Sequence, residues 1–156
     1  MNFRIPLSNI IVWQKRGAKM ISLKESTNTI YAGQHWAKRK EYKDCLAGHA
    51  AKFCKVNERI TTWPVQIKYR FIFETRALDT LNCVYMAKCL EDTLRALQIL
   101  PDDSPKYVAL SILEVVKKDS SQAPSSDKKA NKIQPKAAKE DWLEITIEPY
   151  EFKPSN

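Results

Sequence analysis

Four charged side chains near the middle of the chain have the types and spacing needed for phosphate chemistry: Asp79, Lys88, Asp102 and Asp103. Carboxylate oxygens are the ligands that Mg²⁺ prefers, and a lysine ammonium stabilises negative charge that develops on a phosphate. Acids at both ends of a helix with a cation between them therefore suit metal-assisted phosphoryl chemistry. The same residues also suit plainer roles, because an aspartate before a helix is commonly its cap and Asp-Asp between prolines commonly forms a solvated turn.

The helix that must position these side chains is predicted between Asp79 and the turn at 101–105. On a period of 3.6 residues its apolar side chains share one arc, while Tyr85, Lys88 and Asp92 project from the opposite side. Extending the helix back through Asp79 would place that carboxylate on the apolar side, so we expect Asp79 to precede the first turn. The apolar arc consists of Cys83, Met86, Ala87, Leu90, Leu94 and Leu97.

Alternating polarity predicts the strands around this helix. The clearest one, Val65–Glu74, leads through Arg76 directly to Asp79, so the candidate acid lies where a strand meets the helix. Arg76 is a candidate DNA contact at the same place. Further strands are predicted at Lys19–Lys24, as the first strand of the core, at Tyr107–Val116 and at Trp142–Glu148.

A second helix is predicted over about 36–55, after a polar loop at Ser26–Trp36. Apolar residues recur along it every three or four positions, and lysines lie opposite them. Its basic start and the loop before it suit contacts with a sugar–phosphate backbone, although a solvated basic helix end would have the same composition. The candidate contacts are Asn28, Tyr31, His35, Trp36, Lys38, Arg39 and Lys40.

Length and composition indicate one compact domain, because 156 residues with 44% hydrophobic content can bury a core. The excess of 26 Lys and Arg over 18 Asp and Glu gives a net charge of +8, which favours nucleic acid as a partner over an acidic membrane surface. We expect an N-terminal extension at 1–17, a domain at 18–149 and a tail at 150–156. Within the extension, Asn9–Trp13 suits either an extra edge strand or an unstructured lead-in. The Lys/Ser/Pro-rich insert at 117–140 is predicted to be disordered and either lies along a phosphate backbone or is simply solvated.

The four cysteines have no CxxC spacing, so neither a zinc knuckle nor a disulfide framework is predicted. Cys45 and His49 lie one helical turn apart, and we expect a small thiol beside a packed imidazole there, because a zinc site needs about four ligands. The longest apolar stretch near the start, Ile10–Trp13, is too short for a membrane span or a signal peptide. A soluble cytoplasmic protein is predicted.

The order of strand, helix, strand, helix, strand and strand predicts an α+β fold, with two main helices covering a small mixed or antiparallel sheet. Two stretches add a family resemblance. ISLKESTNTIYAGQHWAKRK resembles the opening of the RusA family of Holliday junction resolvases, especially its phage and prophage members. LDTLNCVYMAKCLEDTLRALQILPDDSPKYV resembles that family's core motif, with Lys88, Asp92, Leu94 and Asp102-Asp103 in register, and WLEITIE resembles its closing strand.

This resemblance, over about 20–148 without the insert, implies a homodimer that nicks four-way DNA junctions with Mg²⁺, or with Mn²⁺, in a bacterial cell. Two equivalent sites suit two symmetric strands. By resemblance, Asp79 and Asp103 would hold the metal, with Asp102 as the alternative to Asp103. Lys88 would stabilise developing charge, and Asn82 would orient a ligand or a DNA phosphate.

The sequence departs from the family at one point. The RusA family usually has two acids separated by one residue just before its Asn, whereas the matching region here is Ala77-Leu78-Asp79, so one acid is missing. This departure and the lysine-rich insert favour an alternative: a catalytically weak or inactive protein of the same fold that binds branched DNA. A third possibility is a protein that presents its basic surface to an acidic partner protein.

Overall fold

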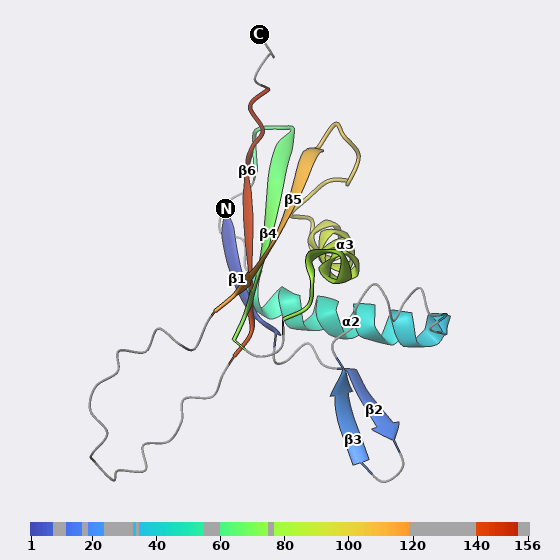
Figure 1. The fold of residues 1–156 in the computed structure, drawn as a ribbon. Helices are drawn as coiled ribbons and strands as arrows, with labels where there is room; N and C mark the ends of the chain where they lie inside the picture. The colour runs from blue at the N-terminus through green and yellow to red at the C-terminus, as the bar shows by residue number, and fades with distance from the viewer. Residues whose placement is uncertain are drawn as a thin grey trace, which may run out of the picture.

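The computed structural model describes residues 1–7, 12–16, 19–23, 33, 35–54, 60–74, 77–118 and 140–152, and for 12–16 and 19–23 it describes the backbone. A four-stranded mixed sheet and two helices form the body of the protein, which confirms the predicted α+β class (Figure 1). In sheet order the strands are β1 (Asn2–Pro6), β6 (Trp142–Pro149), β4 (Val65–Phe73) and β5 (Val108–Lys117). The helices are α2 (Trp36–Phe53) and α3 (Thr80–Ala96).

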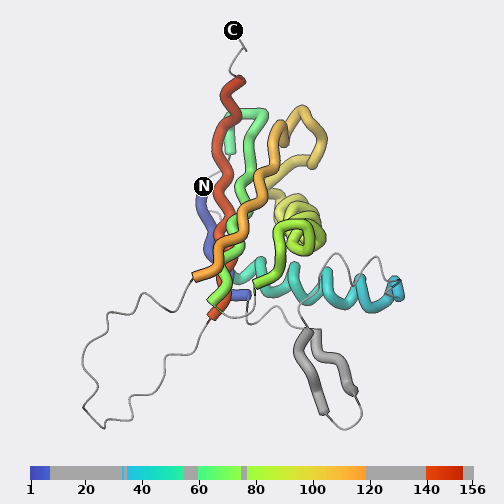
Figure 2. The backbone as a smooth tube through the Cα atoms, in the orientation of Figure 1, coloured from blue at the N-terminus to red at the C-terminus, as the bar shows by residue number. Residues whose placement is uncertain are grey.

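Strand β4 is one of the two inner strands of the sheet, and it pairs with β6 on one side and β5 on the other. Its side chains alternate between buried and half-buried, as expected for a strand that faces the core on one side. Both helices lie on that buried side of the sheet (Figure 1, Figure 2). The core they enclose includes Tyr42 and Leu46 from α2, Leu90 and Leu94 from α3, and Phe71 from β4.

Helix α3 connects two parallel neighbours, β4 and β5. Parallel strands need a crossover connection, and here α3 supplies it while covering the sheet. The predicted apolar arc is buried from Cys83 to Leu94, whereas Leu97 is 36% exposed. α3 therefore forms the crossover, and the turn that follows it leads the chain to the start of β5.

The prediction that Lys19–Lys24 is the first strand of the core is wrong. A strand does form there, β3 (Lys19–Leu23), but it pairs with β2 (Val12–Arg16) in a separate two-stranded sheet. The core strand at the start of the chain is instead β1, within the segment predicted to be an extension. Phe3 and Ile5 alternate along β1 and are buried, and β1 pairs with β6, which lies at the far end of the sequence. Alternation correctly predicted a strand at 19–23, but no strand was predicted at Asn2–Pro6, where pairing with β6 places the core strand.

Asp141, a buried residue directly before β6, forms hydrogen bonds with the residues that follow β4 and β1. Asp141 is 4% exposed, and its side chain accepts a hydrogen bond of 2.8 Å from the Glu74 backbone N–H. Its backbone carbonyl accepts another, of 2.7 Å, from the N–H of Leu7. Most of the insert predicted at 117–140, namely 119–139, falls outside the described residues, as do 153–156 of the predicted tail.

The sheet face away from the helices carries a row of alternating charges. Arg4, Glu144, Arg70 and Glu114 stand opposite one another in register across all four strands. Arg70 lies 3.5 Å from Glu144 and 3.6 Å from Glu114. A hydrogen bond from Lys68 lowers the pKa of Glu114. Charges on this face are thus largely paired with one another.

His49 joins α2 to the end of β1. Its Nε2–H donates to the carbonyl of Pro6 at 3.1 Å, and its ring lies 5.0 Å from that of Phe53. The imidazole is therefore packed, as predicted, and the four cysteines are free thiols. Burial raises the pKa of Cys54 to about 11.

We expect His49 to make folding sensitive to acid. Burial, with the Pro6 carbonyl opposing it and the charge of Lys52 adding to it, lowers the pKa of His49 below its ordinary value of 6.5. The unfolded chain therefore binds a proton first as pH falls, so this contribution to stability is present above pH 6.5 and is lost below it. Thermal unfolding of His49→Gln, which keeps an amide donor but does not titrate, should depend less on pH between about 7.5 and 5. An identical pH dependence in both proteins would contradict this assignment.

Within the described residues, neither helix is both long and apolar enough to span a bilayer.

Candidate functional site

The start of α3 is organised by Asp79, which caps the helix as predicted. Its Oδ1 accepts the backbone N–H of Asn82 at 2.8 Å, and its Oδ2 accepts the Asn82 side-chain amide at 2.6 Å. Both carboxylate oxygens thus bind one residue of the first turn, which satisfies a donor that the helix leaves without a partner. Between these two residues Leu81 is 76% exposed.

The end of α3 turns the chain back toward the helix through a Schellman cap. Gln98 adopts a left-handed conformation, with φ of 58°. The N–H of Ile99 bonds to the Leu94 carbonyl and that of Gln98 to the Arg95 carbonyl, each at 2.9 Å. This pattern satisfies carbonyls that the helix end leaves free. It also directs the following residues, including Asp102 and Asp103, back along the side of α3.

An ion-pair cluster forms where this turn meets the helix. Lys88 Nζ lies 2.5 Å from Asp103, 3.2 Å from Glu91 and 3.6 Å from Asp92, so three carboxylates surround one ammonium. Arg95 lies 3.3 Å from Asp102 and 3.3 Å from Asp103. We call Lys88, Glu91, Asp92 and Asp103 the Lys88 cluster.

The Lys88 cluster favours ionised side chains. The hydrogen bond from Lys88 lowers the pKa of Asp103, and the same bond, with Glu91 and Asp92 adding to it, raises the pKa of Lys88. Lys88 therefore keeps its positive charge at neutral pH. Beneath the cluster, burial and then the charges of Glu91 and Asp92 raise the pKa of Tyr69, so its phenol remains protonated.

Helix α2 reaches the cluster through Lys43, whose ammonium lies 2.5 Å from Asp92. Sequence reasoning placed Lys43 and Asp92 on the polar faces of two helices but could not pair them, because they are far apart in the chain. It also missed Glu91, whose side chain is only 14% exposed. The available signal was its spacing of three residues from Lys88, at which helical side chains meet.

The structure brings together two of the three predicted catalytic residues, Lys88 and Asp103, and holds Asp79 elsewhere. Asp79 binds Asn82, and Asp103 binds Lys88, six residues later on α3, which corresponds to about 9 Å along the helix axis. Across the described residues no three His, Cys, Asp or Glu side chains are grouped to hold a metal ion. The oxygen donors suit Mg²⁺ chemically, but the predicted ligands Asp79, Asp102 and Asp103 do not form one set in this arrangement.

The basic start of α2 presents several of the predicted DNA contacts. The Nδ1 of His35 accepts the N–H of Ala37 at 3.3 Å and so caps the helix, and the Trp36 side chain is 64% exposed. Lys38 pairs with Glu41 at 2.8 Å, whereas Arg39 and Lys40 are exposed. Asn28, Tyr31 and Arg76 lie outside the described residues, and Asn82 is at the start of α3.

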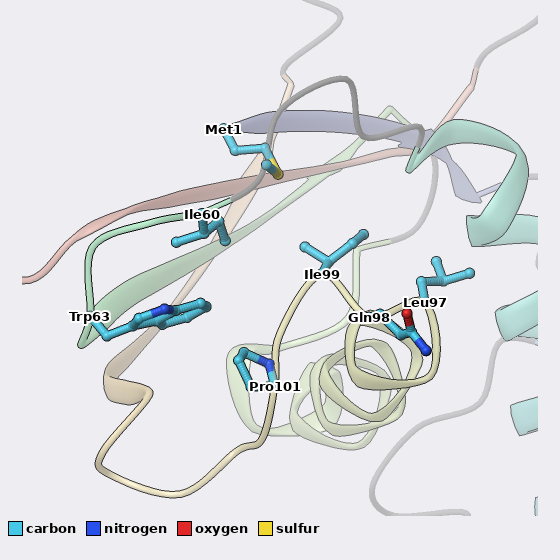
Figure 3. A pocket seen from close by; sticks show the side chains of 7 residues that line it. All are labelled: Met1, Ile60, Trp63, Leu97, Gln98, Ile99 and Pro101. Atoms are coloured by element: carbon cyan, nitrogen blue, oxygen red, sulfur yellow. The ribbon is translucent and has the colours of Figure 1, made fainter.

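A pocket of about 490 Å³ opens beside the end of α3 (Figure 3). Its lining residues are mostly of apolar type and come from the N-terminus, the connection before β4 and the turn after α3. It contains none of the predicted catalytic residues, although Pro101 in its wall directly precedes Asp102. The lining residues are Met1, Ile60, Trp63, Leu97, Gln98, Ile99 and Pro101.

Comparison with protein-family models finds no family that matches this chain, and comparison with curated proteins finds no matching relative. The sequence resemblance and the geometry of the Lys88 cluster therefore supply the grounds for a function.

Proposed function

We propose that this protein is a structure-selective endodeoxyribonuclease that nicks four-way DNA junctions in the presence of Mg²⁺, acting as a homodimer. The contact between Lys88 and Asp103 carries the proposal. Both residues belong to the RusA-like motif, where they are 15 positions apart in sequence, and the fold brings them into contact. In the proposed reaction Lys88 stabilises charge that develops on the scissile phosphate, and Asp103 holds its ammonium in place. The start of α2 supplies backbone contacts that position the DNA.

A second candidate is a protein of the same fold that binds branched DNA and cuts it weakly or not at all. Two observations favour it: Asp79 binds Asn82, about 9 Å along the axis of α3 from the Lys88 that Asp103 contacts, and one acid of the family pattern is missing. In this case junction binding would weaken steeply with salt, because counterion release dominates affinity, and Mg²⁺ would yield no product.

A labelled synthetic four-way junction separates the two candidates. The nuclease predicts paired nicks near the branch point that require Mg²⁺ and are absent from a linear duplex of the same sequence. Under either candidate function, the protein should bind the junction in EDTA without cutting it. Folded protein that binds the junction but produces no nick, with Mg²⁺ or Mn²⁺ at any concentration, would leave only the binding protein.

Two substitutions at Asp79 separate its capping role from a role in the reaction. Asparagine caps helices about as well as aspartate, so Asp79→Asn should keep the free energy of unfolding while removing the charge, whereas Asp79→Ala should cost about 1 kcal/mol. If Asp79 holds the metal, both variants lose nicking. Urea unfolding and junction nicking measured on both proteins test this, and full nicking by Asp79→Asn would reduce Asp79 to a cap.

A further inference from the structure

The positive charge of the chain is not carried by its folded body. Among residues whose side chains the structure describes, acidic and basic residues nearly balance in number, and many of them are paired with one another. These residues include 13 basic and 14 acidic side chains, so the whole net charge of +8 comes from the remaining segments. An anionic partner should be bound mainly there, and the β2–β3 hairpin is the one of these segments whose strand pairing the structure describes.

The β2–β3 hairpin concentrates cations at its closed end. Lys15, Arg16 and Lys19 flank the two connecting residues 17 and 18, and the backbone register places Arg16 opposite Lys19. Like charges directly opposite each other destabilise a strand pair, and a two-stranded hairpin alone is only marginally stable in water. A polyanion at the closed end would relieve this repulsion.

The dimensions of the hairpin favour duplex DNA among the possible polyanions. Two antiparallel strands of five residues each make a ribbon about 17 Å long, with strands about 4.8 Å apart. The major groove of duplex DNA, about 12 Å wide and 8.5 Å deep, admits such a two-stranded ribbon. The ribbon is separate from the main sheet, and β2 contacts α2, whose first two turns carry Lys38, Arg39 and Lys40 (Figure 1).

We propose that the β2–β3 hairpin is a DNA-binding arm whose basic end enters the major groove of a duplex, while the start of α2 contacts the adjoining backbone. This inference rests on the proposed function for its choice of DNA, but it concerns binding and not cutting. Each of the three cations then neutralises one phosphate. The arm would thus supply a large share of the affinity for DNA, because the body has nearly equal numbers of acidic and basic side chains.

The test compares two triple variants of the full chain that remove the same charge. The first changes the arm, with Lys15→Gln, Arg16→Gln and Lys19→Gln. The control changes three cations that are ion-paired on the body, with Arg4→Gln, Lys68→Gln and Lys118→Gln. Affinity for a 30-base-pair duplex is measured by fluorescence anisotropy in EDTA between about 50 and 200 mM salt, where phosphate contacts set the slope of log K against log salt. Circular dichroism is used to check that both variants are folded.

The arm variant should lose at least about tenfold in affinity, and its salt slope should be shallower by about 2.7, or 0.9 for each lost phosphate contact. The control should keep the wild-type slope. A major-groove dye such as methyl green should compete with the wild-type protein, and the minor-groove ligand netropsin should not. An unchanged slope in the arm variant, equal losses in both variants or competition by netropsin alone would overturn the proposal.

The outcomes also separate this inference from the proposed function. Wild-type protein that binds duplex through the arm but never nicks a junction keeps the arm and removes the nuclease. Nicking by the arm variant with an unchanged salt slope removes the arm and keeps the nuclease. Wild-type protein with no affinity for any DNA at 50 mM salt would overturn both and favour an acidic protein partner.

Discussion

Lys88→Met and Asp103→Asn are each expected to reduce junction nicking by about 100- to 1,000-fold, the usual loss when one preorganised group that stabilises transition-state charge is removed. The two side chains lie 2.5 Å apart, and in the proposed reaction Asp103 acts by holding the Lys88 ammonium. Because they act as a unit, the double variant should be little worse than either single variant. Single-turnover nicking at saturating protein, with junction affinity measured in parallel, isolates the chemical step.

Lys68→Met is the matched control for Lys88→Met. Lys68 is also a half-exposed lysine paired with a carboxylate, Glu114, but it lies on the sheet face away from the helices. The Lys68→Met variant should nick junctions at the wild-type rate. Since Lys88 has a raised pKa and Asp103 a lowered one, this pair should add no inflection to the nicking rate between about pH 6 and 9. Normal nicking by both Lys88→Met and Asp103→Asn would remove the cluster from the proposed reaction.

Leu81→Asp is expected to raise Mg²⁺-dependent nicking by about tenfold or more, the range over which a single supporting group changes metal affinity or activity. The RusA family pattern has two acids separated by one residue just before its Asn. The acid missing here matches Ala77, which packs against the core, so we add the second acid at Leu81 instead, where it restores that spacing with Asp79 directly before Asn82. Leu81 is 76% exposed, so a polar side chain there removes no buried contact area of consequence. An acid in the first turn also interacts favourably with the positive end of the helix.

Val84→Asp provides the control for Leu81→Asp. Val84 is 46% exposed and lies three residues further along the same helix, so it adds the same charge about 4.5 Å away along the axis. It should not increase nicking. The nicking rate is measured against Mg²⁺ concentration for both variants. Equal rates in Leu81→Asp and the wild-type protein would show that the missing acid does not limit activity at this position.

Local chemistry in the sequence predicted the central helix closely. Asp79 was expected to precede its first turn and does cap it, and the apolar arc from Cys83 to Leu94 is buried. The strand before it was predicted as Val65–Glu74 and forms as Val65–Phe73. These features follow from side-chain period and from capping, both of which depend on neighbours within a few residues. Residue types and spacing, and then the family resemblance, suggested that Lys88 and Asp103 act together, but neither predicted their direct contact.

Pairing between distant segments was beyond such reasoning. The alternation at Lys19–Leu23 correctly indicated a strand, yet the sheet took β1 instead, because Phe3 and Ile5 pack into the core when β1 pairs with β6. The contact of Lys43 with Asp92 likewise depends on how α2 crosses α3. Neither contact leaves a trace in local periodicity.

The sequence by itself determined the helices, most strands, the Asp79 cap and the charge excess, because each is a property of composition or of residues close in the chain. Only the tertiary structure decided that Asp103 meets Lys88 while Asp79 stays with Asn82, and that the folded body has no excess of positive charge. The physical reason is that a helix of 17 residues holds its two ends far apart. Acids at both ends can share one ion only if the chain folds back over the whole helix, whereas the Schellman turn brings Asp103 back only as far as Lys88 and Arg95.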